Sequence, residues 1–386
     1  MADHERDRDR ALRPGVPVHD VQVGAADRGV VLILHPDAGF RPALYQRFHA
    51  RSLWPAVPID AEAPVRLADI ERARAVVRRY LNVPTPLEPA PLLSRELGCE
   101  VWLKLETLHP TRAYKVRGAL AKLSSLERER LTRGVVAASA GNHGQAVAWA
   151  AWRLGTSAVI VMPKTVDTSI VERCRAYGAD VRLAGDVYDD TLALAHEVEE
   201  RDGRTFVHPY GDPIVIAGQA TIGLEIMEQL PAAQVVVAGV GGGGLVSGLA
   251  TALKTSGWRG KIYGVEPEGA DAVSRSIAAG HVISVDHPLS IADKLVAKST
   301  LPITLDIFGR YVDQVVRVSE RAIADAMYEY LSRLSLLVEG SAAVGLAALR
   351  GGLIDNRGRH VVLVVSGANV SAELIAQIVS ERRARR

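Results

Sequence analysis

A single lysine stands where an expected strand hands over to a helix. Lys115 follows the strand expected at 101–105 and begins the helix expected at 115–126. Alone, a lysine at a helix start is usually a solvated surface residue. A lysine that attacks an aldehyde must be neutral for part of the time, which requires burial or a nearby positive charge. Arg117 is either that charge or the partner of a structural salt bridge. This position makes Lys115 a candidate for an amine that forms a Schiff base.

Four consecutive glycines, Gly241, Gly242, Gly243 and Gly244, follow an apolar strand and open a helix. Without Cβ atoms, their backbone N–H groups can converge on a phosphate, to which the helix N-terminus adds its positive end. The alternative is a flexible turn, but four glycines are costly in entropy, and we therefore favour anion binding. The run fits neither a dinucleotide fingerprint, which needs an acidic ribose partner, nor a Walker loop, which needs Gly-Lys-Ser/Thr.

A polar turn at 139–145 follows another expected strand. Ser139, Asn142 and the N–H groups of the turn would form a nest for a carboxylate or a phenolic oxygen. An ordinary N-cap, made by Ser139 or Asn142, explains the same residues equally well. His143 alone is more often a structural histidine than a catalytic one.

A serine, Ser366, ends the strand expected at 361–365, at the edge where active sites of parallel sheets lie. Its hydroxyl can hydrogen-bond a neutral pyridine nitrogen, although Ser366-Gly367 alone is only a turn. The amine, the phosphate cradle, the carboxylate nest and this hydroxyl together are what an enzyme using pyridoxal 5'-phosphate needs.

The elements that position these residues alternate between short Val/Ile-rich strands and helices, which predicts βαβ units and parallel sheets. Strands are expected at 101–105, 135–138, 158–162, 181–183, 235–238, 262–265 and 361–365. Helices are expected at 67–77, 115–126, 143–154, 169–177, 190–200, 214–229, 245–253, 321–334 and 341–349, with a closing helix from 370.

Length and composition limit the class of protein. With 386 residues, two domains or lobes are expected. The net charge of +2 gives no reason to expect a nucleic-acid partner. Cys99 and Cys174 make no disulfide framework and no metal spacing, which suggests free thiols in a reducing compartment. The charged amino terminus lacks the apolar run of a signal peptide, and no segment reaches membrane-spanning length. We expect a cytoplasmic protein with no membrane partner.

From about residue 67 to 378 the sequence resembles pyridoxal phosphate enzymes of fold type II, closest to the threonine/serine dehydratase (ammonia-lyase) and serine racemase group. The stretch 113–119, Ala-Tyr-Lys-Val-Arg-Gly-Ala, is similar to the Ser-Phe-Lys-x-Arg-Gly-Ala signature, and the stretch 215–225 is close to another family segment. The resemblance implies that Lys115 is the Schiff-base lysine. It also implies that Asn142 holds the cofactor's ring hydroxyl, that Ser139, Asn142 and His143 bind the substrate carboxylate, that Gly241, Gly242, Gly243 and Gly244 hold the phosphate, and that Ser366 binds the pyridine nitrogen.

The resemblance also implies an architecture. The expected fold is α/β and tryptophan synthase β-like, with two lobes that each hold a mainly parallel sheet flanked by helices. A large cofactor-binding domain would comprise 66–136 and 207–386, with a small domain, 137–206, inserted in it. Residues 1–65, with a short strand at 30–34, would form an N-terminal extension of unknown role. The family suggests a homodimer or homotetramer.

Several positions depart from the family pattern. Ala140 replaces the second serine that racemases use as an acid/base, so elimination should be favoured over racemisation. His143 stands where O-acetylserine-type synthases usually have threonine. Arg112 and Ala113 replace the more usual glycine and serine. A Mg²⁺ or K⁺ site would use Glu266 and the Ala270 carbonyl, but a carboxylate used by some members falls on Ala272.

The resemblance implies a dehydratase that converts a 2-amino-3-hydroxy acid, such as L-threonine or L-serine, into a 2-oxo acid and ammonia, with Lys115 taking the α-proton. The alternatives are a β-replacement synthase acting through an aminoacrylate, less favoured a serine racemase, or a binding protein that has kept the fold. The presence of Lys115 and the glycine run speaks against the last. The sequence leaves open threonine, serine, hydroxyaspartate or a bulkier substrate.

Overall fold

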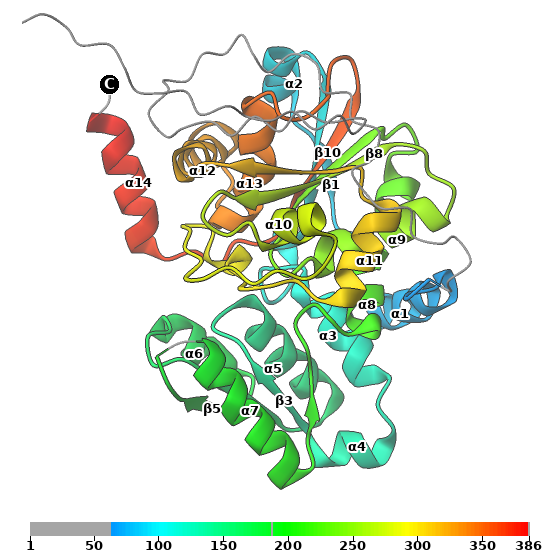
Figure 1. Cartoon of the computed structure of the whole chain (residues 1–386), viewed down its shortest axis with the longest axis vertical. Coiled ribbons are helices and arrows are strands. Elements are labelled where there is room, and N and C mark those ends of the chain that lie inside the picture. Colours follow the sequence, from blue (N-terminus) through cyan, green and yellow to red (C-terminus); the bar gives the residue numbers. More distant parts are fainter. Residues whose placement is uncertain (1–62, 187, 385–386) are drawn as a thin grey trace, which may run out of the picture. The chain divides into compact units, whose positions relative to one another are not determined.

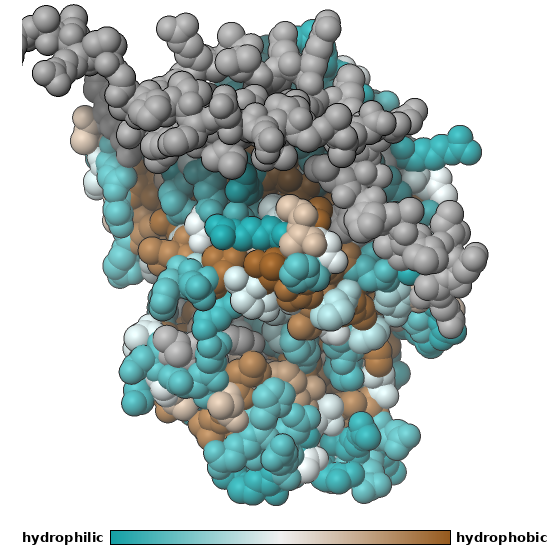
Figure 2. Space-filling model, in the orientation of Figure 1, coloured by the Kyte–Doolittle hydropathy of each residue, from teal (hydrophilic) through white to brown (hydrophobic). Residues whose placement is uncertain are grey.

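The computed structural model describes residues 63–186 and 188–384 (Figure 1). The strand expected at 30–34, and all but the last three residues of the expected extension 1–65, lie outside the described residues. Within the described ranges, no helix combines the length and apolarity needed to cross a membrane. On the face seen in Figure 2, hydrophobic residues are interspersed with hydrophilic ones.

The larger sheet has six strands in the order β1-β2-β10-β7-β8-β9. Its edge strand β1 pairs antiparallel with β2, and the other neighbours are parallel. β10 therefore lies inside the sheet, between β2 and β7. The strands are β1 (Leu87–Pro89), β2 (Glu100–Leu105), β7 (Val235–Gly239), β8 (Lys261–Pro267), β9 (Gln314–Val318) and β10 (His360–Val365).

The smaller sheet has four parallel strands in the order β5-β4-β3-β6. Figure 1 shows it beside α5, α6 and α7. The strands are β3 (Val135–Ala138), β4 (Ala158–Met162), β5 (Asp180–Leu183) and β6 (Thr205–Phe206). The boundaries 66–136, 137–206 and 207–386 stay a prediction, because a sheet does not by itself define where a domain begins.

Helices flank both sheets. Two short 3₁₀ helices, η2 (Glu106–Leu108) and η3 (Asp293–Leu295), accompany the α-helices. The α-helices are α1 (Leu67–Tyr80), α2 (Pro91–Leu97), α3 (Lys115–Ser124), α4 (Arg128–Arg133), α5 (Asn142–Leu154), α6 (Thr168–Ala176), α7 (Tyr188–Asp202), α8 (Pro213–Gln229), α9 (Gly244–Thr255), α10 (Ala272–Ala279), α11 (Pro302–Tyr311), α12 (Glu320–Leu334), α13 (Gly340–Arg350) and α14 (Ala372–Ala384).

Local sequence explains why the central elements form. β7 reads Val-Val-Val-Ala-Gly and is buried throughout, as expected of a parallel strand covered on both faces. α8 starts with Pro213 in its first turn, and Asp212 Oδ1 accepts the Ile214 N–H at 2.8 Å. Helix α8 is buried along most of its length.

The predicted α/β fold with parallel sheets flanked by helices is confirmed, and each expected strand and helix from 67 onward is present, with ends shifted by up to three residues. The sequence interpretation missed three short strands, β1, β6 and β9, and the helices α2, α4, α10 and α11. β9 alternates in burial and lies at a sheet edge, so it lacks the continuous apolar run of the inner strands.

Candidate functional site

Lys115 and Ser366 are brought together by backbone pairing between two distant loops. β10 and β2 are parallel, so the residues that follow them meet at one edge of the sheet. The Tyr114 N–H donates to the Ser366 carbonyl at 3.0 Å, and the Ala368 N–H donates to the Arg112 carbonyl at 2.9 Å. Ser366 is buried, and Lys115 begins α3 one residue after the first of these bonds. The structure therefore brings the segments that carry Lys115 and Ser366 together at one edge of the sheet.

The Lys115 amine lies in a partly buried position. Its Nζ donates to the Pro209 carbonyl at 2.8 Å. Burial lowers the pKa of Lys115 to about 8, while the negative charge of Glu339 acts in the opposite direction. An amine with this pKa is neutral often enough at neutral pH to act as a nucleophile.

We expect the rate of pyridoxal phosphate uptake by the cofactor-free protein to rise as pH increases through 8. Only the neutral amine attacks the aldehyde, so for a group with a pKa near 8 the reactive fraction grows about tenfold between pH 7 and pH 9. Stopped-flow absorbance after mixing with the cofactor measures this rate. A rate that rises about tenfold per pH unit and levels off only near pH 10 would mean that Lys115 is solvated.

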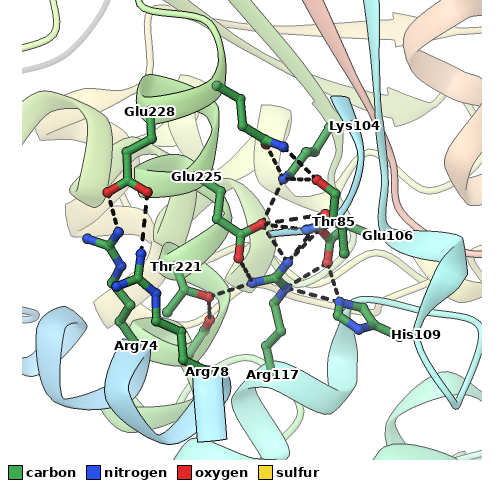
Figure 3. Close-up of polar contacts among 12 residues, drawn as sticks. Arg74, Arg78, Thr85, Lys104, Glu106, His109, Arg117, Thr221, Glu225 and Glu228 are labelled. Atoms are coloured by element: carbon green, nitrogen blue, oxygen red, sulfur yellow. Dashed lines mark hydrogen bonds and ion pairs between the residues drawn. The ribbon is translucent and has the colours of Figure 1, made fainter. Parts of the chain in front are cut away.

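Arg117 belongs to a buried ion-pair network rather than to the surroundings of the Lys115 amine (Figure 3). Its Nε lies 2.7 Å from Glu106 Oε2, and its Nη1 lies 2.6 Å from Glu225 Oε1. Lys104 Nζ also contacts Glu225, at 2.7 Å. The interpretation of Arg117 as a structural ion-pair partner is confirmed, and burial, not this charge, lowers the pKa of Lys115.

The glycine run forms the tight entry to α9. Gly243 has a φ of 99°, in the left-handed region that favours glycine. A Cβ on Gly242 would lie 2.5 Å from carbons of the Tyr210 ring. The Ser247 N–H donates to the Gly243 carbonyl. The N–H groups of the residues just before Ser247 therefore lie ahead of the first hydrogen bond of this helix. These groups suit a phosphate.

We expect Gly242→Ala to weaken cofactor binding and to destabilise the protein by about 1–3 kcal/mol, because the added methyl group overpacks against Tyr210. Fluorescence titration with pyridoxal phosphate and urea unfolding would measure the two effects. Gly345→Ala in α13 is the matched control, since its Cβ would make an ordinary contact with Val237 at 3.5 Å. Equal behaviour of the two variants would argue against a tight cradle.

The polar turn at 139–141 connects β3 to α5. Ser139 Oγ accepts the Gly141 N–H at 3.1 Å. Gly141 is the N-cap of α5, and no side chain caps this helix. The alternative that Ser139 or Asn142 is an ordinary N-cap is therefore wrong, and the first N–H groups of α5 are not used by a capping side chain.

Asn142 and His143 are both buried and bonded to the protein. Asn142 Nδ2 donates to Glu339 Oε1 at 2.8 Å, and its Oδ1 accepts from Asn369 Nδ2 at 2.7 Å. His143 Nε2 donates to the Val207 carbonyl at 2.7 Å. Its Nδ1 has no hydrogen-bond partner among the described residues.

The imidazole of His143 is held neutral. Burial and the charge of Lys115 lower its pKa to about 3. Because Nε2 carries the proton given to Val207, Nδ1 offers only a lone pair. A carboxylate at this turn would therefore be bound by backbone N–H groups, including that of His143, rather than by its ring.

A cavity of about 240 Å³ lies beside this turn. Its lining includes Ala140, Arg173, Lys294, Glu339 and Asn369. A Cβ on Gly141 would lie 2.8 Å from Lys294 Cδ, so this lysine covers the turn directly. The cavity is large enough for a small amino acid.

The residues at this edge of the sheet fit pyridoxal phosphate. A partly buried amine with a pKa of about 8, a glycine turn with free helical N–H groups and a buried hydroxyl are the donors that the cofactor requires. Lys115 would hold the aldehyde, Gly241, Gly242, Gly243 and Gly244 the phosphate, and Ser366 the ring nitrogen.

Glu266, a predicted cation ligand, is bonded to the start of α10. Its Oε1 accepts the Val273 N–H at 2.8 Å, and its Oε2 accepts both the N–H and the hydroxyl of Ser274. Burial raises the pKa of Glu266 to about 7. No group of three acidic, histidine or cysteine side chains within the described part could hold a metal ion. A cation at Glu266 and the Ala270 carbonyl would have to share these oxygens, and it stays a prediction.

The sequence interpretation missed Glu339, Asn369, Tyr210 and Lys294. Asn369 stands three residues after Ser366, and Glu339 directly precedes α13 between apolar stretches. The sequence feature that could have identified Glu339 is a carboxylate between two apolar stretches. The pairing of Asn142 with both residues depends on segments about two hundred residues apart, which local patterns do not reveal.

Comparisons with known proteins identify the family of this chain. Residues 79–367 match the pyridoxal-phosphate dependent enzyme family. The chain is 40% identical to the L-threonine ammonia-lyase of Thermotoga maritima over 317 residues, which are 82% of this chain and 79% of that protein. It is 37% identical to the L-threonine dehydratase catabolic TdcB of Escherichia coli K12, covering 83% of this chain and 98% of that one.

Comparison with solved structures indicates the same family. The processed form of threonine deaminase isoform 2 from Solanum lycopersicum has a TM-score of 0.77 and 33% identity, covering 85% of this chain and 93% of that chain. Maize serine racemase has a TM-score of 0.78 and 31% identity, covering 83% and 99%. This chain therefore belongs to the fold type II pyridoxal phosphate enzymes, in the threonine/serine dehydratase and serine racemase family.

Proposed function

We propose that this protein is a pyridoxal phosphate-dependent ammonia-lyase that dehydrates a 2-amino-3-hydroxy acid, such as L-threonine or L-serine, to a 2-oxo acid and ammonia. The observations that carry the proposal are the partly buried Lys115 amine, whose neighbour Tyr114 pairs with the buried Ser366, and a cavity of amino-acid size beside the turn at 139–141. The relatives named threonine ammonia-lyase or dehydratase support the same reaction.

The cofactor and the residues of the protein have separate roles in the reaction. When bound, the cofactor supplies an electron sink for the bonds at the substrate's α-carbon. Lys115 takes the α-proton, for which its lowered pKa suits it. The N–H groups at the start of α5 bind the substrate carboxylate and so orient the α-hydrogen.

Elimination is favoured over racemisation. Ala140 lines the cavity and carries no hydroxyl that could return a proton to the opposite face of the α-carbon. Loss of the β-hydroxyl is therefore favoured over return of a proton to the opposite face.

Turnover of purified, cofactor-loaded protein tests the function. L-Threonine, L-serine and 3-hydroxyaspartate are supplied in turn, and the released 2-oxo acid is measured. A second series adds thiols or amines and looks for new amino acids. Release of a 2-oxo acid supports the lyase reaction. Formation of a new amino acid without any 2-oxo acid would show that the enzyme catalyses β-replacement instead.

The cellular location and the oligomeric state of the enzyme are part of the same proposal. Cys99 and Cys174 are buried free thiols, and burial raises the pKa of Cys174 to about 12. Unpaired thiols are usual in a reducing compartment, and the cytoplasm is our proposed location. A homodimer or homotetramer is proposed from the resemblance, and light scattering of the holoenzyme would measure its mass.

A further inference from the structure

Glu339 is a buried carboxylate to which the mechanism above gives no role. Its side chain is 2% exposed, and it directly precedes α13. Oε1 and Oε2 accept from Asn142 Nδ2 at 2.8 and 3.1 Å, and Oε2 also accepts the Asn369 N–H at 3.1 Å. Among the described residues, no salt bridge includes Glu339. A buried carboxylate without an ion-pair partner is costly when it is charged, so its retention calls for a reason.

The position of Glu339 connects the amine to the cavity. The carboxyl lines the cavity together with Ala140 and Asn369. Its charge also acts on Lys115 and on Tyr114, and it raises the pKa of both groups. The same carboxyl thus faces the cavity beside the turn at 139–141 and is within electrostatic reach of the group that takes the α-proton.

Dehydration needs an acid as well as a base. Hydroxide is a poor leaving group, and a positioned acid that protonates it in the transition state contributes about 10²–10⁴-fold to the rate. Lys115 is the base in the proposed function, and a separate acid allows the α-proton to be taken while the hydroxyl is protonated. In the cavity wall near the turn, Ala140 cannot supply this proton and Lys294 is paired with Asp293. The His143 ring next to the turn has no second proton to give.

We propose that Glu339 is the acid that protonates the departing β-hydroxyl. The proposal rests on the dehydratase function. The bond between the β-carbon and oxygen breaks, its electron pair leaves with the oxygen, and the O–H bond of the Glu339 carboxyl breaks to complete a water molecule. At this stage Lys115 has gained the α-proton and Glu339 has lost its proton. Transfer of one proton from the Lys115 ammonium to the Glu339 carboxylate restores both groups.

The electrostatics suit this role. Burial raises the pKa of Glu339 to about 7, opposed by the charge of Lys294 and the Asn142 hydrogen bond and assisted by Asp293. A substantial fraction of the carboxyl is therefore protonated at neutral pH. The pKa of the Lys115 amine, about 8, lies only slightly higher, so a proton can pass in either direction at little cost.

A substrate whose leaving group needs no proton separates this role from a structural one. L-Serine loses hydroxide, whereas β-chloro-L-alanine loses chloride, and both give the same 2-oxo acid. In Glu339→Gln we expect turnover of L-serine to fall by about 10²–10⁴-fold, because the amide cannot donate an equivalent proton. Turnover of β-chloro-L-alanine should stay close to that of the unchanged enzyme. Equal losses with both substrates would overturn the proposal and make Glu339 a residue that positions Asn142.

Asn369→Ala is the matched control for positioning. It removes the bond from Asn369 Nδ2 to Asn142 but leaves the Glu339 carboxyl in place. We expect it to lower turnover of both substrates by the same factor. If Asn369→Ala instead affected L-serine alone, protonation of the leaving group could not be assigned to Glu339.

The unchanged holoenzyme gives a test that does not depend on the folding of a variant. The ratio of kcat for L-serine to kcat for β-chloro-L-alanine should fall as pH rises through 7, as Glu339 loses its proton. Titration of Lys115 affects both substrates and cancels in the ratio. The other titratable groups that interact with this carboxyl are Lys294, Asp293 and Tyr114. A ratio independent of pH would overturn the proposal. Release of 2-oxo acid from β-chloro-L-alanine but from no hydroxy amino acid would instead contradict the dehydratase function itself.

Discussion

Replacing Lys115 by alanine is expected to lower turnover by at least about 10²–10⁴-fold, the usual contribution of a positioned proton-transfer group. The loss should be larger if the same amine also holds the cofactor. No other described lysine begins a helix directly after a residue that pairs with Ser366. The 2-oxo acid assay measures turnover, and borohydride reduction followed by mass spectrometry shows whether the cofactor is covalently attached at residue 115.

Lys261→Ala is a suitable control, because this lysine forms a partly exposed pair with Asp355. It should leave both turnover and cofactor attachment unchanged. Native turnover of Lys115→Ala, or cofactor trapped on another lysine of the unchanged enzyme, would show that the site has been assigned to the wrong amine.

The second large effect concerns stability. Glu225 and Glu228 stand one turn apart on α8, yet their side chains are 7% and 49% exposed. Glu225 pairs with the buried Arg117 and Lys104, while Glu228 pairs with Arg74 and Arg78 (Figure 3). Glu225→Gln leaves two buried cations facing the single charge of Glu106. We expect it to lower the free energy of unfolding by about 3–5 kcal/mol.

Glu228→Gln is the control on the same helix, with an expected loss of about 0.2–1 kcal/mol, because its partners stay in contact with water. Urea unfolding of the two variants under the same conditions measures the difference. If both variants lost the same small amount, water would have to reach the network, and the burial of Arg117 would not determine stability.

The sequence was sufficient for the parts of the site that are made by one segment. Lys115 and the glycine run each stand at a joint between a strand and a helix, and the residues on both sides predict that joint. The central strands, such as β7 and β10, were predicted because parallel strands covered on both faces are apolar throughout.

Features that depend on two distant segments could not be predicted in this way. The role of Arg117 was left open because its partners, Glu106 and Glu225, come from η2 and α8. Glu339 and Asn369 were missed because they meet Asn142 only after the two sheets have formed. Short edge strands such as β1, which has three residues, carry too few side chains to form a pattern.

The place of β10 inside the larger sheet has a consequence for synthesis on the ribosome. This strand is the last of the sheet to be made, yet β2 and β7 hydrogen-bond to it from both sides. Until residue 365 has left the exit tunnel, β2 and β7 cannot be joined, and the loop before Lys115 lacks its pairing with Ser366. The nascent chain can complete its smaller sheet early, but it gains an organised lysine only near the end of translation. We therefore expect a partly folded nascent chain to capture the cofactor poorly.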